Sequence, residues 1–236
     1  MRERERTFDV TVVGELNLDL ILYGLPRELE PEREHLADGL SLTLGSSSAI
    51  FAHNPAVLGS RVGFVSRVGE DPLGRISLER LSAAGADVSR VRTAPGAAST
   101  GLTVILTHPG DRHILTYPGT MFEVCHEDLD IDYLASARHF HLSSCFLHRS
   151  LTARIPKLFR TMKDRGLTTS LDTNDDPADR WESGIWETLR HVDVFLPNER
   201  EALRVTGCED LRDAIDGLAS VVPLVVVKLG PQGALA

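Results

Sequence analysis

Two polar side chains stand two residues apart after the first apolar run of the sequence. They are Asn17 and Asp19 in the segment 14–19, GELNLD, and in extended backbone they point to the same side. A carboxylate accepts several hydrogen bonds and a carboxamide both donates and accepts them, so the pair suits the hydroxyl groups of a polyol. The same segment also fits a turn that is stabilised by Asx side chains. The residues alone leave both interpretations open.

A loop of small residues is the second candidate. The segment 44–49, LGSSSA, leads into a helix-like stretch that ends near Leu58 and Gly59. Gly45 and Ser46 would let a ligand approach backbone amides closely, because their side chains are absent or short. Serine at the start of a helix is more often an N-cap. The loop therefore predicts either a binding surface or a helix cap.

Three further motifs follow strand-like runs, at the edge where α/β sheets bind ligands. They are 69–74 (GEDPLG), 172–174 (DTN) and 197–201 (PNERE). Asn198 and Glu201 are three residues apart on the opening turn of a predicted helix, so they face the same way and could hold a hydrated Mg²⁺ beside a phosphate. An asparagine N-cap followed by a capping-box glutamate fits this pattern equally well.

The last residues form an apolar run and a glycine turn. The segment 225–236, VVVKLGPQGALA, carries Lys228 at the end of a buried-type strand, with Gly230 and Gly233 in the turn that follows. Such a turn either holds a nucleotide phosphate or only reverses the chain direction.

Other potential metal ligands are predicted to be structural. His139 and His141 stand at strand spacing and share a face, but no third ligand is apparent nearby. The acidic pairs Asp175-Asp176 and Glu201 with Glu209 are interpreted as solvated surface. The three cysteines are widely spaced and show neither a disulfide framework nor a C-x-x-C pattern, so we expect reduced thiols.

The composition argues against several classes of protein. The 236 residues carry 25 Lys and Arg against 34 Asp and Glu, a net charge of −9 at pH 7, which speaks against nucleic acid or an anionic membrane as a partner. No apolar stretch is long enough for a signal peptide or a membrane span, so we expect a cytoplasmic protein. An anionic phosphate donor could still bind where helix N-termini, backbone amides and a metal ion supply local positive charge.

Strand-like and helix-like segments alternate along the chain. Strands are predicted at 8–13, 62–65, 139–142, 167–171, 192–196 and 222–227, and helices at 49–58, 74–84, 150–165, 181–189, 199–206 and 211–220. This alternation predicts one main domain with a mostly parallel sheet that is covered by helices on both faces. Two stretches, 36–44 and 101–115, break the pattern. The second resembles a β-hairpin, so we expect a small accessory sheet or lid.

The order of these motifs resembles the PfkB carbohydrate kinase family, the ribokinase-like sugar kinases, along essentially the whole chain. The matching residues are Gly14-x-x-Asn17-x-Asp19, the loop from Gly45 to Leu58-Gly59, Gly69-x-Asp71-x-x-Gly74, Asn198-x-x-Glu201 and Gly230-x-x-Gly233. The resemblance implies a Rossmann-like three-layer α/β/α sandwich, a single ribokinase-like domain with a small β-sheet lid at about 20–44 and 99–118.

The resemblance also implies ATP-dependent phosphorylation of a hydroxyl of a sugar or sugar-like small molecule. By resemblance, the sugar would contact Asn17, Asp19, Gly45, Ser46 and Ser143, ATP would contact Asn174, Asn198, Lys228, Gly230 and Gly233, and Glu201 would organise Mg²⁺. A homodimer through the lid is a further hypothesis. Exposed hairpin strands such as 102–106 would then pair at a sheet edge.

Several positions depart from the family pattern. Ser46 stands where the family has a second glycine, Ile50 where it has a sugar-binding asparagine, and Asp176 where an arginine commonly follows Asp-x-Asn. The Gly-Ala-Gly-Asp motif that supplies the catalytic base does not occur, so we expect that base beyond Ala236, and a chain that lacks its C-terminal part and is inactive as it stands. A non-catalytic sugar-binding pseudokinase and a nucleoside kinase stay open as alternatives.

Overall fold

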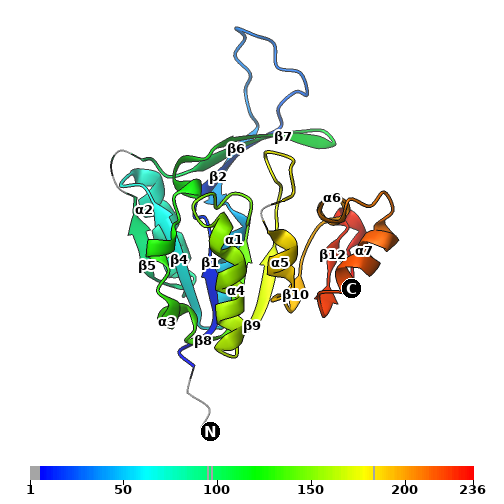
Figure 1. Cartoon of the computed structure of the whole chain (residues 1–236). Coiled ribbons are helices and arrows are strands. Elements are labelled where there is room, and N and C mark those ends of the chain that lie inside the picture. Colours follow the sequence, from blue (N-terminus) through cyan, green and yellow to red (C-terminus); the bar gives the residue numbers. More distant parts are fainter. Residues whose placement is uncertain (1–5, 95, 97, 183) are drawn as a thin grey trace.

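A large parallel sheet forms the centre of the computed structural model, which describes residues 6–94, 96, 98–182 and 184–236 (Figure 1). The strand order is β11-β10-β9-β8-β1-β4-β5, and every pairing is parallel. The prediction of a mostly parallel sheet is confirmed. The bounds are β1 Phe8–Val13, β4 Val62–Val68, β5 Asp87–Thr93, β8 Ala137–Ser143, β9 Thr168–Asp172, β10 Val194–Phe195 and β11 Leu224–Val225.

Helices cover both faces of this sheet, because successive residues of a strand point to opposite faces. Val12 packs in a core with residues of α1 and α2, whereas Val13 packs in a second core with residues of α4 to α7. Figure 1 shows α4 in front of the sheet, running along the direction of the strands. The helices are α1 Ser47–Val57, α2 Pro72–Ala83, α3 Ile131–Leu134, α4 Ile155–Asp164, α5 Ile185–Leu189, α6 Glu199–Thr206 and α7 Leu211–Ala219, with 3-10 turns η1 Gly119–Phe122, η2 His126–Asp128, η3 Thr152–Arg154 and η4 Gly230–Gln232.

A second sheet of four strands lies across the carboxyl ends of the strands of the large sheet (Figure 1). Its strands are β2 Leu18–Tyr23, β3 Gly39–Leu44, β6 Leu102–His108 and β7 Asp111–Tyr117, in the order β3-β2-β6-β7. The expected three-layer sandwich with a small accessory sheet is therefore confirmed. The prediction that 102–106 forms an exposed sheet edge is wrong, because β6 pairs with β2 on one side and with β7 on the other. The edges of this sheet are β3 and β7.

Some boundaries differ from the predicted ones for local reasons. The expected strand 222–227 is divided into β11 and the short β12, Val227–Lys228, which pairs with β13, Ala234–Leu235, in an antiparallel hairpin. The expected helix 181–189 begins only at Ile185, because Trp181 has a left-handed backbone with φ 54° and Gly184 forms the N-cap with φ 71°. Strand β5 was not predicted from the sequence, since it is half-exposed at the sheet edge and rich in polar residues.

Candidate active site

The first of the predicted sugar-binding residues lie where the chain leaves β1 and enters β2 of the small sheet. Asn17 directly precedes β2 and is fully buried, and its Nδ2 donates to the Leu18 carbonyl at 3.3 Å. Its Oδ1 is buried and has no hydrogen-bond partner within the described part of the chain. A buried acceptor without a donor costs about 1–3 kcal/mol. A donor that reached this buried position would therefore be stabilised by Asn17.

Gly45 lies against the side chains of Asn17 and Asp19. The structure therefore brings together three residues that the sequence analysis assigned to sugar binding. The Gly45 amide donates to the Asn17 carbonyl at 2.9 Å. A Cβ added to Gly45 would overlap the Asp19 carboxylate and would lie 2.9 Å from Asn17 Nδ2. Partial burial raises the pKa of Asp19, and the positive charge of Arg112 on β7 offsets part of this rise.

Ser46 is the helix cap that the alternative interpretation of the loop required. Its backbone is left-handed with φ 63°, and its Oγ accepts a hydrogen bond from the Ala49 amide at 3.0 Å. The same hydroxyl donates to the Glu15 carbonyl at 2.7 Å. The predicted sugar contact therefore has its hydrogen-bonding capacity largely engaged inside the protein, and the capping holds α1 against the loop that follows β1.

A buried glutamate, which the sequence analysis did not single out, organises this edge of the sheet. Glu15 Oε1 accepts from Ser144 Oγ at 2.8 Å, and Oε2 accepts from Ser48 Oγ at 2.8 Å and lies 3.5 Å from His148 Nε2. Burial alone would raise the pKa of Glu15, but hydrogen bonds and the charge of His148 together with the Ser144 hydroxyl hold it at about 2. Glu15 is therefore an ionised carboxylate in the protein interior.

Ser144, rather than the predicted Ser143, takes part in this network. Ser143 Oγ is buried and forms a hydrogen bond with His141 Nε2 at 2.7 Å, so this hydroxyl is engaged with His141 and not with Glu15. His141 also bonds to Ser170 Oγ at 2.6 Å and stacks on Phe51. Burial lowers the pKa of His141 to about 3, so the ring is neutral. This arrangement agrees with the structural role expected for His141.

The sequence analysis assigned Asn174 to ATP, but its side-chain amide contacts Ser47 and Ser144, which lie near the residues predicted to bind the sugar. Its Nδ2 donates to Ser144 Oγ at 3.2 Å and to Ser47 Oγ at 3.4 Å. Its backbone amide donates to Asp172 Oδ1 at 3.3 Å, and Lys228 Nζ donates to the other oxygen of Asp172 at 2.7 Å. Asn174 therefore connects the loop of α1 with the strand ends that carry the predicted phosphate-binding residues.

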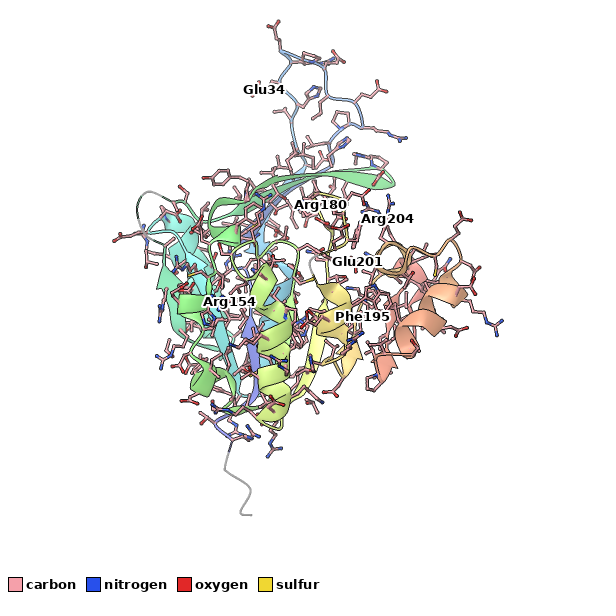
Figure 2. The ribbon with its side chains drawn as sticks, in the orientation of Figure 1. Glu34, Arg154, Arg180, Phe195, Glu201 and Arg204 are labelled. Carbon is pink, nitrogen blue, oxygen red and sulfur yellow. The ribbon has the colours of Figure 1, made fainter. Side chains whose placement is uncertain are left out.

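Asn198 and Glu201 form a capping box at the start of α6. The Asn198 side chain accepts from the Glu201 amide at 2.9 Å, and the Glu201 carboxylate accepts from Asn198 N at 2.8 Å, from Asn198 Nδ2 at 2.6 Å and from Thr173 Oγ1 at 3.2 Å. Burial raises the pKa of Glu201, and the Asn198 amide opposes this rise. Figure 2 shows Glu201 at the edge of the large sheet that faces the small sheet. Its burial corrects the expectation of solvated surface.

The fit of these residues to Mg²⁺ follows from the same contacts. Both oxygens of Glu201 already accept hydrogen bonds, so direct coordination would break the capping box. Among the residues that the structure describes, no group of three carboxylate, histidine or cysteine side chains is arranged to hold a metal ion. The arrangement does not fit a preformed metal site, and the assignment of Glu201 to Mg²⁺ stays a prediction.

Two predicted motifs have clear structural roles. Gly230 and Gly233 have φ of 57° and 92° and close the turn between β12 and β13, where the Leu229 amide donates to the Gly233 carbonyl at 2.8 Å. Asp71 caps α2 by accepting from the Gly74 amide at 2.8 Å and also accepts from the Thr100 amide at 2.6 Å. Whether the glycine turn contacts ATP stays a prediction.

Asp176 corrects another expectation, because it is buried rather than solvated. Its carboxylate accepts hydrogen bonds from the backbone amides of Ala178, Arg180 and Trp181, each at 2.9 Å. Burial opposes ionisation, but these amides hold the pKa of Asp176 below its usual value. The neighbouring Asp175 is exposed and pairs with Arg200 at 2.6 Å. Asp176 therefore fixes the turn after β9.

Comparison with known proteins identifies the class to which this fold and edge of polar residues belong. Residues 7–236 match the pfkB family carbohydrate kinases, and the chain therefore belongs to this family. It is 30% identical to the 2-dehydro-3-deoxygluconokinase of Thermoproteus tenax over 98% of this chain and 72% of that protein. It is 27% identical to the cytidine kinase of Thermococcus kodakarensis over 96% of this chain and 75% of that protein.

A solved structure supports the same assignment. The PfkB protein from Polaromonas sp. JS666 superposes with a TM-score of 0.81 at 26% identity, over 96% of this chain and 78% of that one. The ribokinase-like fold expected from the sequence is therefore confirmed. No helix in the described ranges is long and apolar enough to cross a membrane.

Proposed function

We propose that this protein transfers the γ-phosphoryl group of ATP to a hydroxyl of a sugar-like small molecule. Asn17 and Asp19 hold hydroxyl groups of the acceptor beneath the small sheet, and the strand ends that carry Asn198 and Lys228 hold the phosphates. Such a reaction depends mainly on positioning the two substrates and on stabilising charge. Magnesium enters the proposal only as the ion that accompanies ATP.

One observation carries this proposal, namely the line of polar residues along the carboxyl ends of the parallel strands and the start of the small sheet. Asn17 and Asp19 lie against Gly45, and Asn174 bonds to Ser47 and also, through its backbone, to Asp172. Asp172 in turn pairs with Lys228. Ligands of α/β sheets bind outside this edge, so the line supports a site for an acceptor at one end and for phosphates at the other.

A nucleoside acceptor is the second candidate within the same activity. The similarity to a cytidine kinase favours it. Ile50 lies one helical turn after Ser46 in α1, and its side chain is 43% exposed, so an apolar surface is present near the sugar residues. A nucleoside offers both ribose hydroxyls and an apolar ring face. Fold and family do not decide between the two acceptors.

The test is ADP release by the native protein with ATP, Mg²⁺ and a panel of sugars and nucleosides. We expect ADP to appear with at least one acceptor, and we expect Asp19→Asn to raise KM for that acceptor because a charged acceptor of hydrogen bonds is lost. Asp164→Asn is a matched control, since Asp164 is exposed at the end of α4. Acceptor binding without any ADP would support a non-catalytic sugar-binding protein instead.

The dimer hypothesis now concerns different strands. The free edges of the small sheet are β3 and β7, and both carry exposed apolar side chains, including Leu40 at 67% and Ile114 at 57% exposure. Light scattering at micromolar concentration should show a dimer, and Ile114→Lys should produce monomers. A wild-type protein that is monomeric in this assay would remove the hypothesis.

A further inference from the structure

A cavity that plays no part in the candidate active site lies between α4 and the segment 126–131. Its volume is about 180 Å³, and its floor is apolar, because Leu151, Ile155 and Leu158 are buried there and Leu129 and Ile131 are partly buried. A dry apolar cavity of about 150 Å³ holds a benzene molecule. This cavity therefore has room for one aromatic ring or for an aliphatic chain of similar size.

Basic side chains stand at the mouth of this cavity. His126, Arg154 and Lys157 line it and are exposed, whereas the apolar residues of the floor are covered. Arg154 and Lys157 are three residues apart at the start of α4, and Leu158 and Thr161 continue the same face of that helix. The cavity therefore combines an apolar floor with a mouth that carries positive charge.

Arg154 and Lys157 have no ion-pair partner in the part of the chain that the structure describes. The other lysines of the sequence are Lys163 and Lys228, and each of them pairs with an aspartate. The aspartates of the neighbouring segment pair with arginines outside the cavity, namely Asp128 with Arg67 at 2.7 Å, Asp130 with Arg90 at 3.3 Å and Asp132 with Arg165 at 2.9 Å. The charges of Arg154 and Lys157 are therefore available to a ligand.

Glu127 is the acidic residue that acts on this mouth. A hydrogen bond from Cys125 is the largest cause of the lowered pKa of Glu127, and the charges of His126 and Arg154 contribute to it. The Glu127 side chain is exposed, so water and salt screen its charge. One negative charge against the permanent positive charges of Arg154 and Lys157 leaves the mouth positive, although the whole chain carries −9. The mouth therefore favours an anion.

The cavity is separate from the residues that are predicted to bind the sugar and ATP. Figure 2 shows Arg154 and Glu201 on opposite sides of α4. One wall of the cavity is nevertheless joined to the candidate active site, because the Leu151 amide donates to the His148 carbonyl at 2.8 Å and His148 Nε2 lies 3.5 Å from Glu15 Oε2. A ligand in the cavity would thus contact the segment that holds His148 beside Glu15.

We propose that this cavity binds a small anion with an apolar body, such as an aryl carboxylate or an aryl phosphate. The apolar part lies on the floor formed by Leu151, Ile155 and Leu158. Arg154 and Lys157 bind the anionic group at the mouth, since arginine and lysine side chains donate hydrogen bonds to carboxylate and to phosphate oxygens. The inference goes beyond the proposed function, because it concerns a second site and holds whether or not the protein transfers phosphate.

Calorimetric titration of this chain with phenylacetate and two matched probes tests the inference. We expect phenylacetate to bind with a dissociation constant of about 1 mM or lower, which requires only a modest free energy per atom for a ligand of this size. The neutral 2-phenylacetamide should bind about 10-fold more weakly because it lacks the charge. Acetate should bind at least about 10-fold more weakly because it lacks the ring. Phenyl phosphate, compared with phenylacetate, distinguishes the two anionic groups.

Substitutions locate the probe in the cavity. The double variant Arg154→Gln, Lys157→Gln should weaken phenylacetate about 10-fold, about 3-fold for each exposed cation, and should leave 2-phenylacetamide unchanged. Arg212→Gln removes a positive charge at an exposed position of α7 and is the control, with both affinities unchanged. Thr161→Phe keeps the charges but places a ring at the cavity, so it should weaken both probes at least about 10-fold.

Several results would overturn the inference and leave the kinase proposal standing. If 2-phenylacetamide binds as tightly as phenylacetate, the cations at the mouth do not recognise an anion. If phenylacetate binds folded Thr161→Phe as it binds the wild type, or is lost in Asp19→Asn, the probe occupies another site. If neither phenylacetate nor phenyl phosphate binds, the stems of Arg154 and Lys157 only cover apolar surface, and the cavity is not a site for such anions.

Discussion

The substitution Gly45→Ala tests most directly the geometry of the residues that are predicted to bind the sugar. A Cβ at position 45 would lie 2.6 Å from Asp19 Cγ, whereas carbon atoms in contact are separated by at least about 3.5 Å. The Asp19 carboxylate would therefore have to retreat by at least about 0.9 Å, because its nearer oxygen overlaps the added Cβ even more than Cγ does. Hydrogen bonds to a charged group contribute about 1.5–3 kcal/mol, so their loss predicts a roughly 10- to 150-fold weaker affinity for the acceptor.

The assay is calorimetric titration of the acceptor that gives the strongest signal with the wild-type protein. Gly217→Ala is the control, because a Cβ there meets no atom within 4 Å and alanine favours the helix α7. We expect that variant to bind normally and to be at least as stable as the wild type. A folded Gly45→Ala protein with wild-type affinity would refute the assignment of Asp19 to the acceptor.

Three further predictions concern buried carboxylates. The pKa of Glu15 is about 2 in the folded protein against a usual 4.5, so about 3 kcal/mol of stability is present above pH 4.5 and is lost as the pH falls toward 2. Urea unfolding across this pH range should show this loss in the wild-type protein but not in Glu15→Gln. If the free energies of unfolding of the two proteins change with pH in parallel, the prediction is contradicted. Asp176→Ala should lower the free energy of unfolding by about 3 kcal/mol, because several backbone amides lose their acceptor. The same substitution at the exposed Asp175 should have little effect. Equal losses of stability in the two variants would show that the buried contacts of Asp176 do not matter. Glu201→Ala should cost about 1 kcal/mol through loss of the capping box, with the exposed Glu199→Ala as the comparison in the same unfolding assay, and the prediction fails if both behave alike.

Elements with strong local signals were predictable to the residue. The β-branched run of β1 was predicted at its observed bounds, 8–13. The helix α6 was predicted at 199–206, because an asparagine cap with its capping-box glutamate begins it and Gly207 in left-handed conformation ends it. Strand β5 lacked such a signal, since exposure at the sheet edge permits polar residues along it.

The candidate site was only partly predictable, for a reason that lies in the strand register. Asn17, Asp19 and Gly45 belong to motifs that can be read locally. The partnership of Glu15 with Ser144 spans 129 residues and depends on the pairing of Val13 with Leu142, which places the residues two positions after this pair side by side. No pattern within a single segment reports that register. The repeated serines in 46–48 were the one local signal of a polar cluster.

The boundary between the two sheets runs between Asn17 and Asp19, two of the residues predicted to bind the sugar. Asn17 belongs to the loop that leaves the large sheet, whereas Asp19, two positions later, is already hydrogen-bonded into the small sheet. A rotation of one sheet against the other would therefore pivot between the two side chains and change their separation. Under the proposed function, an acceptor held by both side chains would resist that rotation, so occupancy and the relative orientation of the sheets would form a single linked equilibrium. The affinity of the acceptor is then also a measure of how stiff this pivot is.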